Sequence, residues 1–153
     1  MKITIHKADS SALASITHFQ LEMASETEEL LLDHAVVKEG VRFIFEHPSH
    51  GFYLLASEGT TVVGCLLVLY EWSDWRNGHV LWLHSVYVLP EYRQNGIFKS
   101  MYQYVKNMVS RDNSMKGIRL YVEKENKLAQ KVYQDIGMTD EHYTLFEWLK
   151  ENS

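Results

Sequence analysis

Hydrophobic and polar positions follow strand spacing and then helix spacing along the first third of the chain. Lys2–Lys7 alternates with the period of two that is typical of a strand. Leu13–Met23 and Leu31–Phe45 both carry apolar residues three or four positions apart, the spacing of a helix. The polar stretch Ser25–Glu29 separates the two patterns, and Pro48 disfavours helical geometry in the residue before it. This region therefore predicts one strand and two helices.

Three strands and two tight turns are predicted next. The first turn contains Gly59, and the second ends in Asn77-Gly78, a pair that is typical of hairpins. Because a hairpin joins antiparallel neighbours, we expect antiparallel pairing here. The predicted strands are Gly51–Ser57, Val62–Trp72 and His79–Leu89.

The remainder of the chain alternates helices with strands. Gly96 opens a helical pattern, and Ile118–Glu123 follows as a strand. Asn126 begins a short helix that Gly137 closes, and Tyr143–Leu149 alternates as a final strand. A strand–helix–strand unit requires a crossover between parallel strands. The predicted fold is therefore α/β (α+β), with a mixed, mostly antiparallel sheet, a parallel strand pair that can splay apart, and helices on both faces.

Length and composition favour a single domain over residues 1–153. Hydrophobic residues make up 46% and charged residues 23% of the chain, near the globular average. A formal charge of −5 argues against a nucleic-acid partner. The longest apolar run, Val62–Tyr70, is much shorter than the roughly 20 residues of a membrane-spanning helix. Cys65 is the single cysteine and cannot form an internal disulfide, so we expect a cytoplasmic protein.

The connection between the His79–Leu89 strand and the following helix is the first candidate site. Pro90 lacks an N–H and ends the strand, and Arg93 lies three residues before Gly96. Glycine lets a ligand approach the backbone, and the start of a helix offers unpaired N–H groups and positive potential. This combination suits a pyrophosphate. Taken alone, Arg-x-x-Gly is a weak signal and favours an ordinary strand–loop–helix connection with a surface arginine.

The wider pattern resembles a family signature. Val-x-Pro-x-x-Arg-x-x-Gly-Ile, from Val88 to Ile97, resembles the acetyl-CoA signature of the GNAT superfamily of N-acetyltransferases. The order of predicted elements resembles the GNAT fold over nearly the whole chain. Phe98 departs from the family pattern, which has glycine or alanine there. The resemblance implies that the backbone of Val86 and Val88 binds the pantetheine arm of acetyl-CoA, and that Arg93, Gln94, Asn95, Gly96, Ile97, Phe98 and Lys99 bind its pyrophosphate.

Residues 120–138 resemble the second cofactor segment of the same family. Judged alone, Asn126 would be a helix N-cap and Tyr133 a core residue. The resemblance implies that Asn126 also bonds to the cofactor arm and that Tyr133 donates a proton to the departing thiolate. Two motifs in the family's order and spacing favour the catalytic role for Tyr133.

Two residues are candidates for a general base, which is useful because alkylamines are mostly protonated at neutral pH. His84 occupies the position that carries a glutamate in the polyamine acetyltransferases, which this chain resembles most in pattern, and histidine titrates near neutrality. A histidine hydrogen-bonded at the sheet surface is the alternative. Glu71, at the end of the preceding strand, is the second candidate.

The stretch Glu71–Arg76 combines two tryptophans with two carboxylates, which suits a cationic amine. Asp74 falls where polyamine acetyltransferases place a substrate-binding aspartate. The predicted substrate-binding residues are Glu71, Trp72, Asp74 and Trp75.

The sequence therefore predicts an acetyl-CoA-dependent N-acetyltransferase that acts on a primary amine, a small cationic one, by direct attack in a ternary complex. A non-catalytic acyl-CoA-binding module of the same fold, and an acetyltransferase for protein N-termini or lysines, are the alternatives. No metal site is predicted, since the histidines show no ligand spacing. Cys65 lies mid-strand without an adjacent base, which argues against an acetyl-thiol intermediate. A homodimer is left open.

Overall fold

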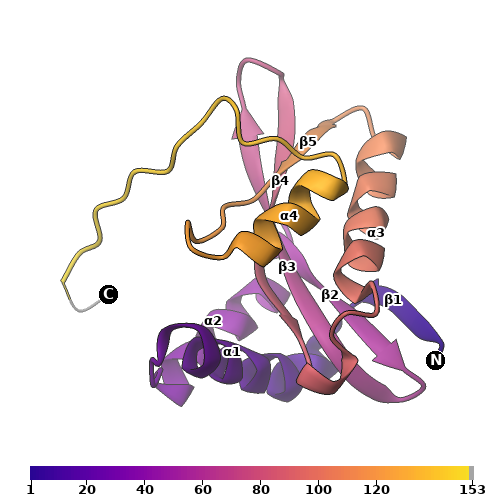
Figure 1. Cartoon of the computed structure of the whole chain (residues 1–153), viewed down its shortest axis with the longest axis vertical. Helices are drawn as coiled ribbons and strands as arrows, with labels where there is room; N and C mark the ends of the chain where they lie inside the picture. Colours follow the sequence, from indigo (N-terminus) through magenta and orange to yellow (C-terminus); the bar gives the residue numbers. More distant parts are fainter. Residues whose placement is uncertain (152–153) are drawn as a thin grey trace. The chain divides into compact units, whose positions relative to one another are not determined.

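The computed structural model describes residues 1–151 of the chain. These form two compact units, Met1–Arg119 and the residues from Leu120 onward, which are described separately. The first unit contains a five-stranded sheet whose strands lie side by side in chain order (Figure 1). The strands are β1 (Ile3–Lys7), β2 (Gly51–Glu58), β3 (Thr61–Ser73), β4 (Gly78–Val88) and β5 (Met115–Arg119).

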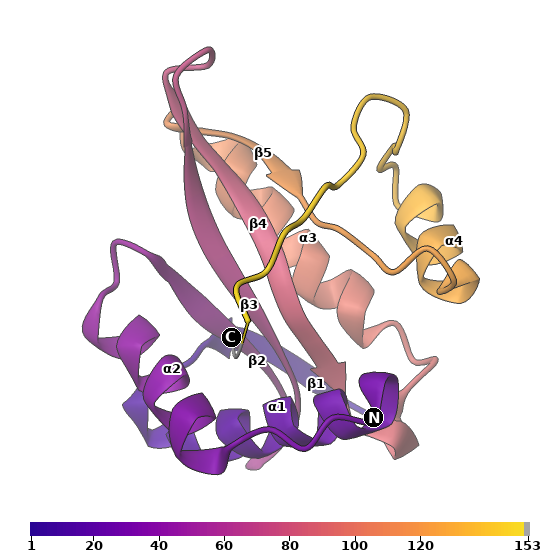
Figure 2. The same cartoon turned by 90° about the vertical axis from the view of Figure 1, so that its left-hand side faces the viewer.

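Helices cover both faces of this sheet, as predicted. α1 and α2 lie on one face, and α3 lies on the other (Figure 2). The helical elements of the first unit are the short 3₁₀ turn η1 (Ser10–Ala12), α1 (Leu13–Glu28), α2 (His34–Glu46), the 3₁₀ turn η2 (Pro90–Tyr92) and α3 (Ile97–Arg111).

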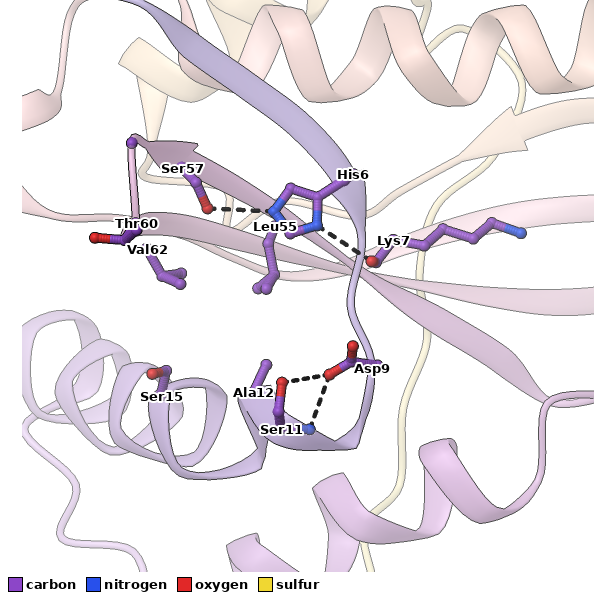
Figure 3. A pocket seen from close by; sticks show the side chains of 11 residues that line it. His6, Lys7, Asp9, Ser11, Ala12, Ser15, Leu55, Ser57, Thr60 and Val62 are labelled. Carbon is purple, nitrogen blue, oxygen red and sulfur yellow. Dashed lines mark hydrogen bonds between the residues drawn. The ribbon is translucent and has the colours of Figure 1, made fainter.

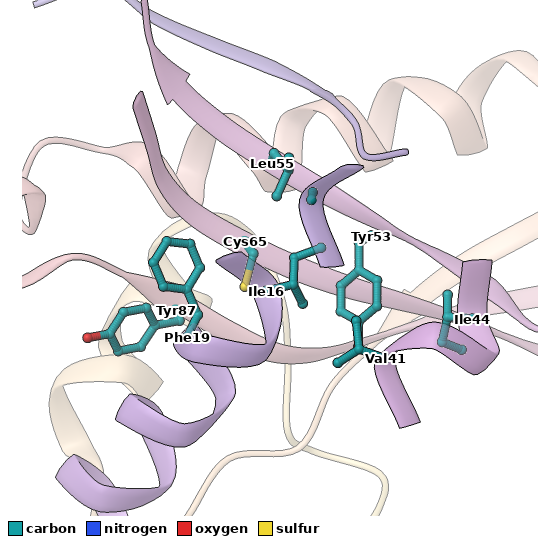
Figure 4. Packing of buried hydrophobic residues seen from close by; sticks show 9 residues of the cluster. Ile16, Phe19, Val41, Ile44, Tyr53, Leu55, Cys65 and Tyr87 are labelled. Atoms are coloured by element: carbon teal, nitrogen blue, oxygen red, sulfur yellow. The ribbon is translucent and has the colours of Figure 1, made fainter. Parts of the chain in front are cut away.

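An apolar cluster joins α1 and α2 to the sheet (Figure 4). Because side chains alternate along a strand, the intervening strand residues Leu54, Leu66 and Leu81 are buried on the face of α3. The cluster on the other face consists of Ala12, Ile16, Phe19, Val41, Ile44, Tyr53, Leu55, Cys65 and Tyr87.

Pairing within the sheet confirms the predicted mixed topology. β1 to β4 pair antiparallel with their neighbours, and β4 and β5 are parallel. The crossover that parallel neighbours require is α3. The parallel ladder ends at Trp82 and Arg119, whereas β4 continues to Val88. Beyond Trp82, β4 therefore has no β5 partner.

A bulge interrupts β4 shortly after this point. Its pairing with β3 shifts register between Leu67–His84 and Cys65–Tyr87, so that β4 has one residue more than β3. Ser85, in this stretch, has a positive φ of 53°. The extra residue places both His84 and Tyr87 on the face of α1 and α2, although strict alternation would separate them.

The boundary between the first two helices differs from the prediction. α1 continues through Ser25–Glu28, and Glu29 follows in the left-handed region with φ of 53°. The Asp33 carboxylate accepts a hydrogen bond from the N–H of Ala35 at 2.9 Å and fixes the start of α2. Leu30–Leu32 therefore precede α2, because the capping side chain, and not apolar spacing, decides where that helix begins.

In the second unit, the predicted helix is confirmed as α4 (Lys127–Asp135). The Asn126 side chain caps it by accepting from the N–H of Ala129 at 3.1 Å. Gly137 follows with φ of 98°, a conformation that favours glycine and ends the helix.

The two strands predicted near this unit are wrong in extent or absent. β5 ends at Arg119, so Ile118–Glu123 is not a strand over most of its length, and residues 143–149 form no strand. Alternating apolar and polar residues give a segment the two faces of a strand, but a strand also requires a hydrogen-bonded neighbour. Within residues 1–151, no helix is both long enough and apolar enough to cross a membrane.

Gly64→Ala should destabilise the protein, because β3 and β4 approach closely there. A Cβ at Gly64 would lie 2.9 Å from the backbone oxygen of Tyr87. We expect the free energy of unfolding, measured with urea, to fall by about 1–3 kcal/mol. Gly117→Ala on β5 is the matched control, since its Cβ would meet nothing within 4 Å, and it should change stability by less than about 1 kcal/mol. Equal losses in the two variants would contradict this interpretation.

Candidate active site

The loop before α3 has a backbone suited to an anion. Gln94 and Gly96 have positive φ angles of 63° and 74°, which glycine adopts freely and glutamine only at a cost. The Asn95 side-chain amide donates to the carbonyl oxygens of Tyr92 at 3.1 Å and Arg93 at 3.0 Å. Left-handed residues in such a loop direct successive backbone N–H groups to one side. The amide of Asn95 holds two carbonyls of the loop, which stabilises this arrangement.

The first turn of α3 extends the same site. Ile97 is buried and anchors the helix start, whereas Lys99 is exposed. The turn carries no acidic residue, although acids are favoured at helix N-termini. The Phe98 ring lies 6.3 Å from the Tyr102 ring, one turn further along α3. A lysine without an acid beside the positive end of a helix favours an external anion.

Arg93 is held by groups from two other elements. Its Nε donates to the Val88 carbonyl oxygen at 2.8 Å, and its Nη2 donates to Oε2 of Glu26 at 2.8 Å. The guanidinium also lies 5.4 Å from the centre of the Tyr87 ring, and the Tyr87 hydroxyl donates to Oε1 of Glu26 at 2.9 Å. The hydrogen bond from Arg93 lowers the pKa of Glu26, while burial and Glu26 raise the pKa of Tyr87 to about 12.

The last part of β4 directs backbone groups toward the side of β5. The N–H of Leu89 donates to the carbonyl of Val63 on β3 at 2.8 Å. Because backbone groups of successive residues point to opposite edges of a regular strand, those of Val88 point away from β3, and the Val88 carbonyl accepts from Nε of Arg93. Beyond Trp82, β4 is no longer paired with β5. An extended ligand can pair with a strand edge of this kind as an added strand.

His84 and Glu71, the two candidate bases, lie on the α1 and α2 face. The His84 ring stacks on the Trp82 ring with centroids 6.2 Å apart. Burial lowers the pKa of His84, so the imidazole is neutral at neutral pH and can accept a proton. The Glu71 carboxylate instead lies 3.3 Å from Nη1 of Arg119, which compensates its charge. A neutral imidazole and a carboxylate that is already paired are thus the two side chains from which a base would come.

The predicted substrate-binding residues are not gathered around His84. Trp72 points to the α3 face, where its ring meets that of His79 edge-on at 5.2 Å. The Asp74 carboxylate accepts from the N–H of Trp75 at 2.9 Å, and both lie in the turn that joins β3 to β4. Gly78, where β4 begins, is six residues from His84, or roughly 20 Å along an extended strand.

In the second unit, the two predicted site residues have defined local roles. Asn126 is the N-cap of α4, the role that its sequence context alone would give it. Burial raises the pKa of the Tyr133 hydroxyl above its ordinary value. The hydroxyl is therefore protonated at neutral pH and able to donate a proton.

Cys65 is unsuited to nucleophilic chemistry. It is fully buried, and its sulfur lies 3.7 Å from the Gln20 amide nitrogen and 3.7 Å from the Ser85 carbonyl oxygen. Burial raises the pKa of the Cys65 thiol to about 12, so the thiolate is absent at neutral pH.

A cavity of about 300 Å³ lies elsewhere in the first unit, between β1, the start of α1 and the β2–β3 turn (Figure 3). Its polar lining includes His6, whose Nε2 lies 3.2 Å from the Ser57 hydroxyl, and Asp9, which accepts from the N–H of Ser11. None of the predicted site residues lines this cavity.

Sequence reasoning missed three contacts around the site, namely Glu26 with Arg93, Tyr87 with Glu26, and Arg119 with Glu71. Glu26 and Arg93 are 67 positions apart, and nothing in a helical pattern indicates a contact over that separation. The bulge at Ser85, which turns Tyr87 toward Glu26, has no glycine to signal its positive φ. Arg119 becomes the partner of Glu71 only through the parallel pairing of β4 with β5.

Comparisons with known proteins identify the family. Residues 14–138 match the model of the Acetyltransferase (GNAT) family. Thialysine N-epsilon-acetyltransferase from Bos taurus is 35% identical over 83 residues, which are 54% of this chain and 48% of that protein. The chain thus spans about half the length of the curated relatives that it matches.

Solved structures share the fold over nearly the full chain. A possible acetyltransferase from Clostridium difficile 630 is 39% identical with a TM-score of 0.90, covering 98% of this chain and 99% of that one. A predicted acetyltransferase from Clostridium acetobutylicum, solved with acetyl-CoA, has a TM-score of 0.76 at 20% identity and covers 99% of this chain and 96% of that one. The second likeness shows the fold alone. The family match includes the loop before α3, α4 and Tyr133, and the enzymes of this family use acetyl-CoA. This chain belongs to the GNAT family of acetyltransferases.

Proposed function

We propose that the protein transfers the acetyl group of acetyl-CoA to a small primary amine by direct attack in a ternary complex. The observation that carries this proposal is the loop before α3, where two left-handed residues precede a helix start without an acid. We further propose that residues 1–153 act as one cytoplasmic N-acetyltransferase domain. Whether two such chains form a homodimer is left open.

In this proposal, β4 and the loop share the binding of acetyl-CoA. The backbone of Val86 and Val88 would pair with the pantetheine arm, because both residues lie on the part of β4 that has no β5 partner. The Val88 carbonyl accepts from Arg93, so Val88 would offer its N–H. The N–H groups of residues 94–99 would bind the pyrophosphate. Lys99 would add a positive charge, and Asn126 would bond to the arm.

Two side chains would move the protons. His84 would take a proton from the attacking amine, directly or through a water molecule, because its lowered pKa keeps it neutral. As the amine nitrogen bonds to the thioester carbon and the carbon–sulfur bond breaks, Tyr133 would give its proton to the thiolate. Buried Cys65 argues against a route through an acetylated enzyme.

The acceptor we propose is a cationic amine. The relatives named thialysine N-epsilon-acetyltransferase support an amine acceptor, although the match covers half their length. Glu71, Trp72, Asp74 and Trp75 remain the proposed acceptor residues. Given the distance along β4, Asp74 and Trp75 could contact the far end of an extended acceptor but not the reacting end.

A second candidate function is an acyl-CoA-binding module without turnover. Phe98 favours it, because a bulky ring in the first turn of α3 replaces the small residue of the family pattern. Binding of acetyl-CoA without transfer to any amine, peptide N-terminus or lysine would support this alternative.

The proposed function is tested first by binding and thiol release. Acetyl-CoA should raise the melting temperature, since a ligand that binds only the folded state stabilises it. A screen of small amines with a thiol reagent should then detect amine-dependent release of coenzyme A. Acetylation of peptides alone would contradict the small-amine acceptor, and no melting shift would contradict the cofactor.

The pH dependence of turnover separates the two proton-transfer roles. At saturating substrates, kcat should fall as the pH drops through a value below the ordinary histidine pKa of about 6.5, because protonated His84 cannot act as a base. His84→Gln should remove this acidic limb and lower kcat by about 10²-fold. Tyr133→Phe should lower kcat by a similar factor but leave the fall of kcat at low pH in place. An unchanged limb in His84→Gln would show that another group is the base.

Asp74→Lys tests the acceptor proposal through acceptor length. A long polyamine that reaches both His84 and the β3–β4 turn should show a KM raised about fivefold, the size expected for an exposed charge interaction. A short diamine should be unaffected, because it cannot span roughly 20 Å. Asp74→Asn, which removes the carboxylate without adding a positive charge, is the control for added charge. Equal effects on short and long acceptors would exclude Asp74 from acceptor binding.

A further inference from the structure

A carboxylate on α1 contacts Arg93 in the loop before α3, residues 93–96, which is called the acetyl-CoA loop below because the proposed function places the cofactor there. Oε2 of Glu26 accepts from Nη2 of Arg93 at 2.8 Å, and Nε of Arg93 donates to the Val88 carbonyl at 2.8 Å. The guanidinium therefore joins the last turns of α1 to the strand edge that would receive the pantetheine arm.

The position of Glu26 is itself fixed by a core residue. The Tyr87 ring packs against Phe19 in the buried cluster, with centroids 5.3 Å apart, and its hydroxyl points out of that cluster (Figure 4). This hydroxyl donates to Oε1 of Glu26 at 2.9 Å. One oxygen of the carboxylate is thus held by the core while the other holds Arg93.

We propose that Glu26 is a positioning residue for the acetyl-CoA loop and that Arg93 acts as a strut, that is, as a rigid link that holds the loop in place between α1 and β4. The Nε and Nη2 groups of Arg93 already bind protein acceptors on β4 and α1. The pyrophosphate then binds the backbone N–H groups that follow Arg93, and α1 determines where that backbone lies. This inference rests on the proposed function, because it assumes that the loop binds acetyl-CoA.

The strut role makes a prediction opposite to that of direct phosphate binding. If Arg93 bound the pyrophosphate through its side chain, Glu26 would compete with phosphate for the guanidinium, and removing its charge would strengthen acetyl-CoA binding. If Glu26 served stability alone, its removal would lower the melting temperature without changing affinity. If Arg93 is a strut, removing the Glu26 charge should weaken acetyl-CoA binding while the protein stays folded.

The test is calorimetric titration of Glu26→Gln with acetyl-CoA. We expect the Kd to rise about fivefold, the size of a partly exposed ion pair, with little change in the melting temperature of the free protein. Glu28→Gln makes the same change in charge two residues further along α1 and should bind like the unchanged protein. Arg93→Lys keeps the positive charge but loses the planar fork, and it should also bind more weakly.

A double variant decides whether Glu26 acts through Arg93. In the Arg93→Lys background, Glu26→Gln should cause little further loss, because residues of one network are not additive. Tighter binding by Glu26→Gln, unchanged binding, or fully additive losses would each overturn the strut role. Failure of the unchanged protein to bind acetyl-CoA would overturn the proposed function itself, and this inference with it.

Discussion

Partial pairing of β4 is the constraint on which the rest of the first unit depends. β4 is paired with β3 from Gly78 to Val88, but with β5 only as far as Trp82. Up to Trp82 the strand is an ordinary interior strand between two neighbours. Beyond it, β4 has no β5 partner, and the chain continues directly into the loop and α3. A strand edge of this kind can pair with an extended ligand. The bulge at Ser85 lies in the same region and turns Tyr87 toward α1.

Electrostatic compensation is distributed unevenly over this region. Glu26 and Glu71, carboxylates near the site, are each paired with an arginine, so neither contributes an uncompensated charge. The start of α3 has the opposite character, with Lys99 and no acid in its first turn. A net charge of −5 therefore coexists with a local preference for an anion.

The elements that the sequence predicts well are those that local patterns determine. Alternation and turn residues identify β1 to β4, and Arg93-x-x-Gly96 marks the loop whose left-handed residues the structure contains. Local patterns failed where a distant partner decides. Residues 143–149 have strand alternation but no strand, and the contact between Glu26 and Arg93 exists only in the folded chain. Proximity in sequence also says little about distance here, because Glu71–Trp75 precedes β4 yet leads to the end of the strand that is remote from the loop.

The length of β4 has an evolutionary consequence. The Ser73–Gly78 turn and the loop before α3 lie at opposite ends of one strand, with the buried side chains of Val80, Leu81 and Leu83 between them. Substitutions in the turn should therefore leave the position of the backbone that would bind acetyl-CoA unchanged. Such a protein can change its acceptor through substitutions in the turn while selection preserves the residues that would bind acetyl-CoA. We therefore expect related chains to diverge most at the turn and least at the start of α3.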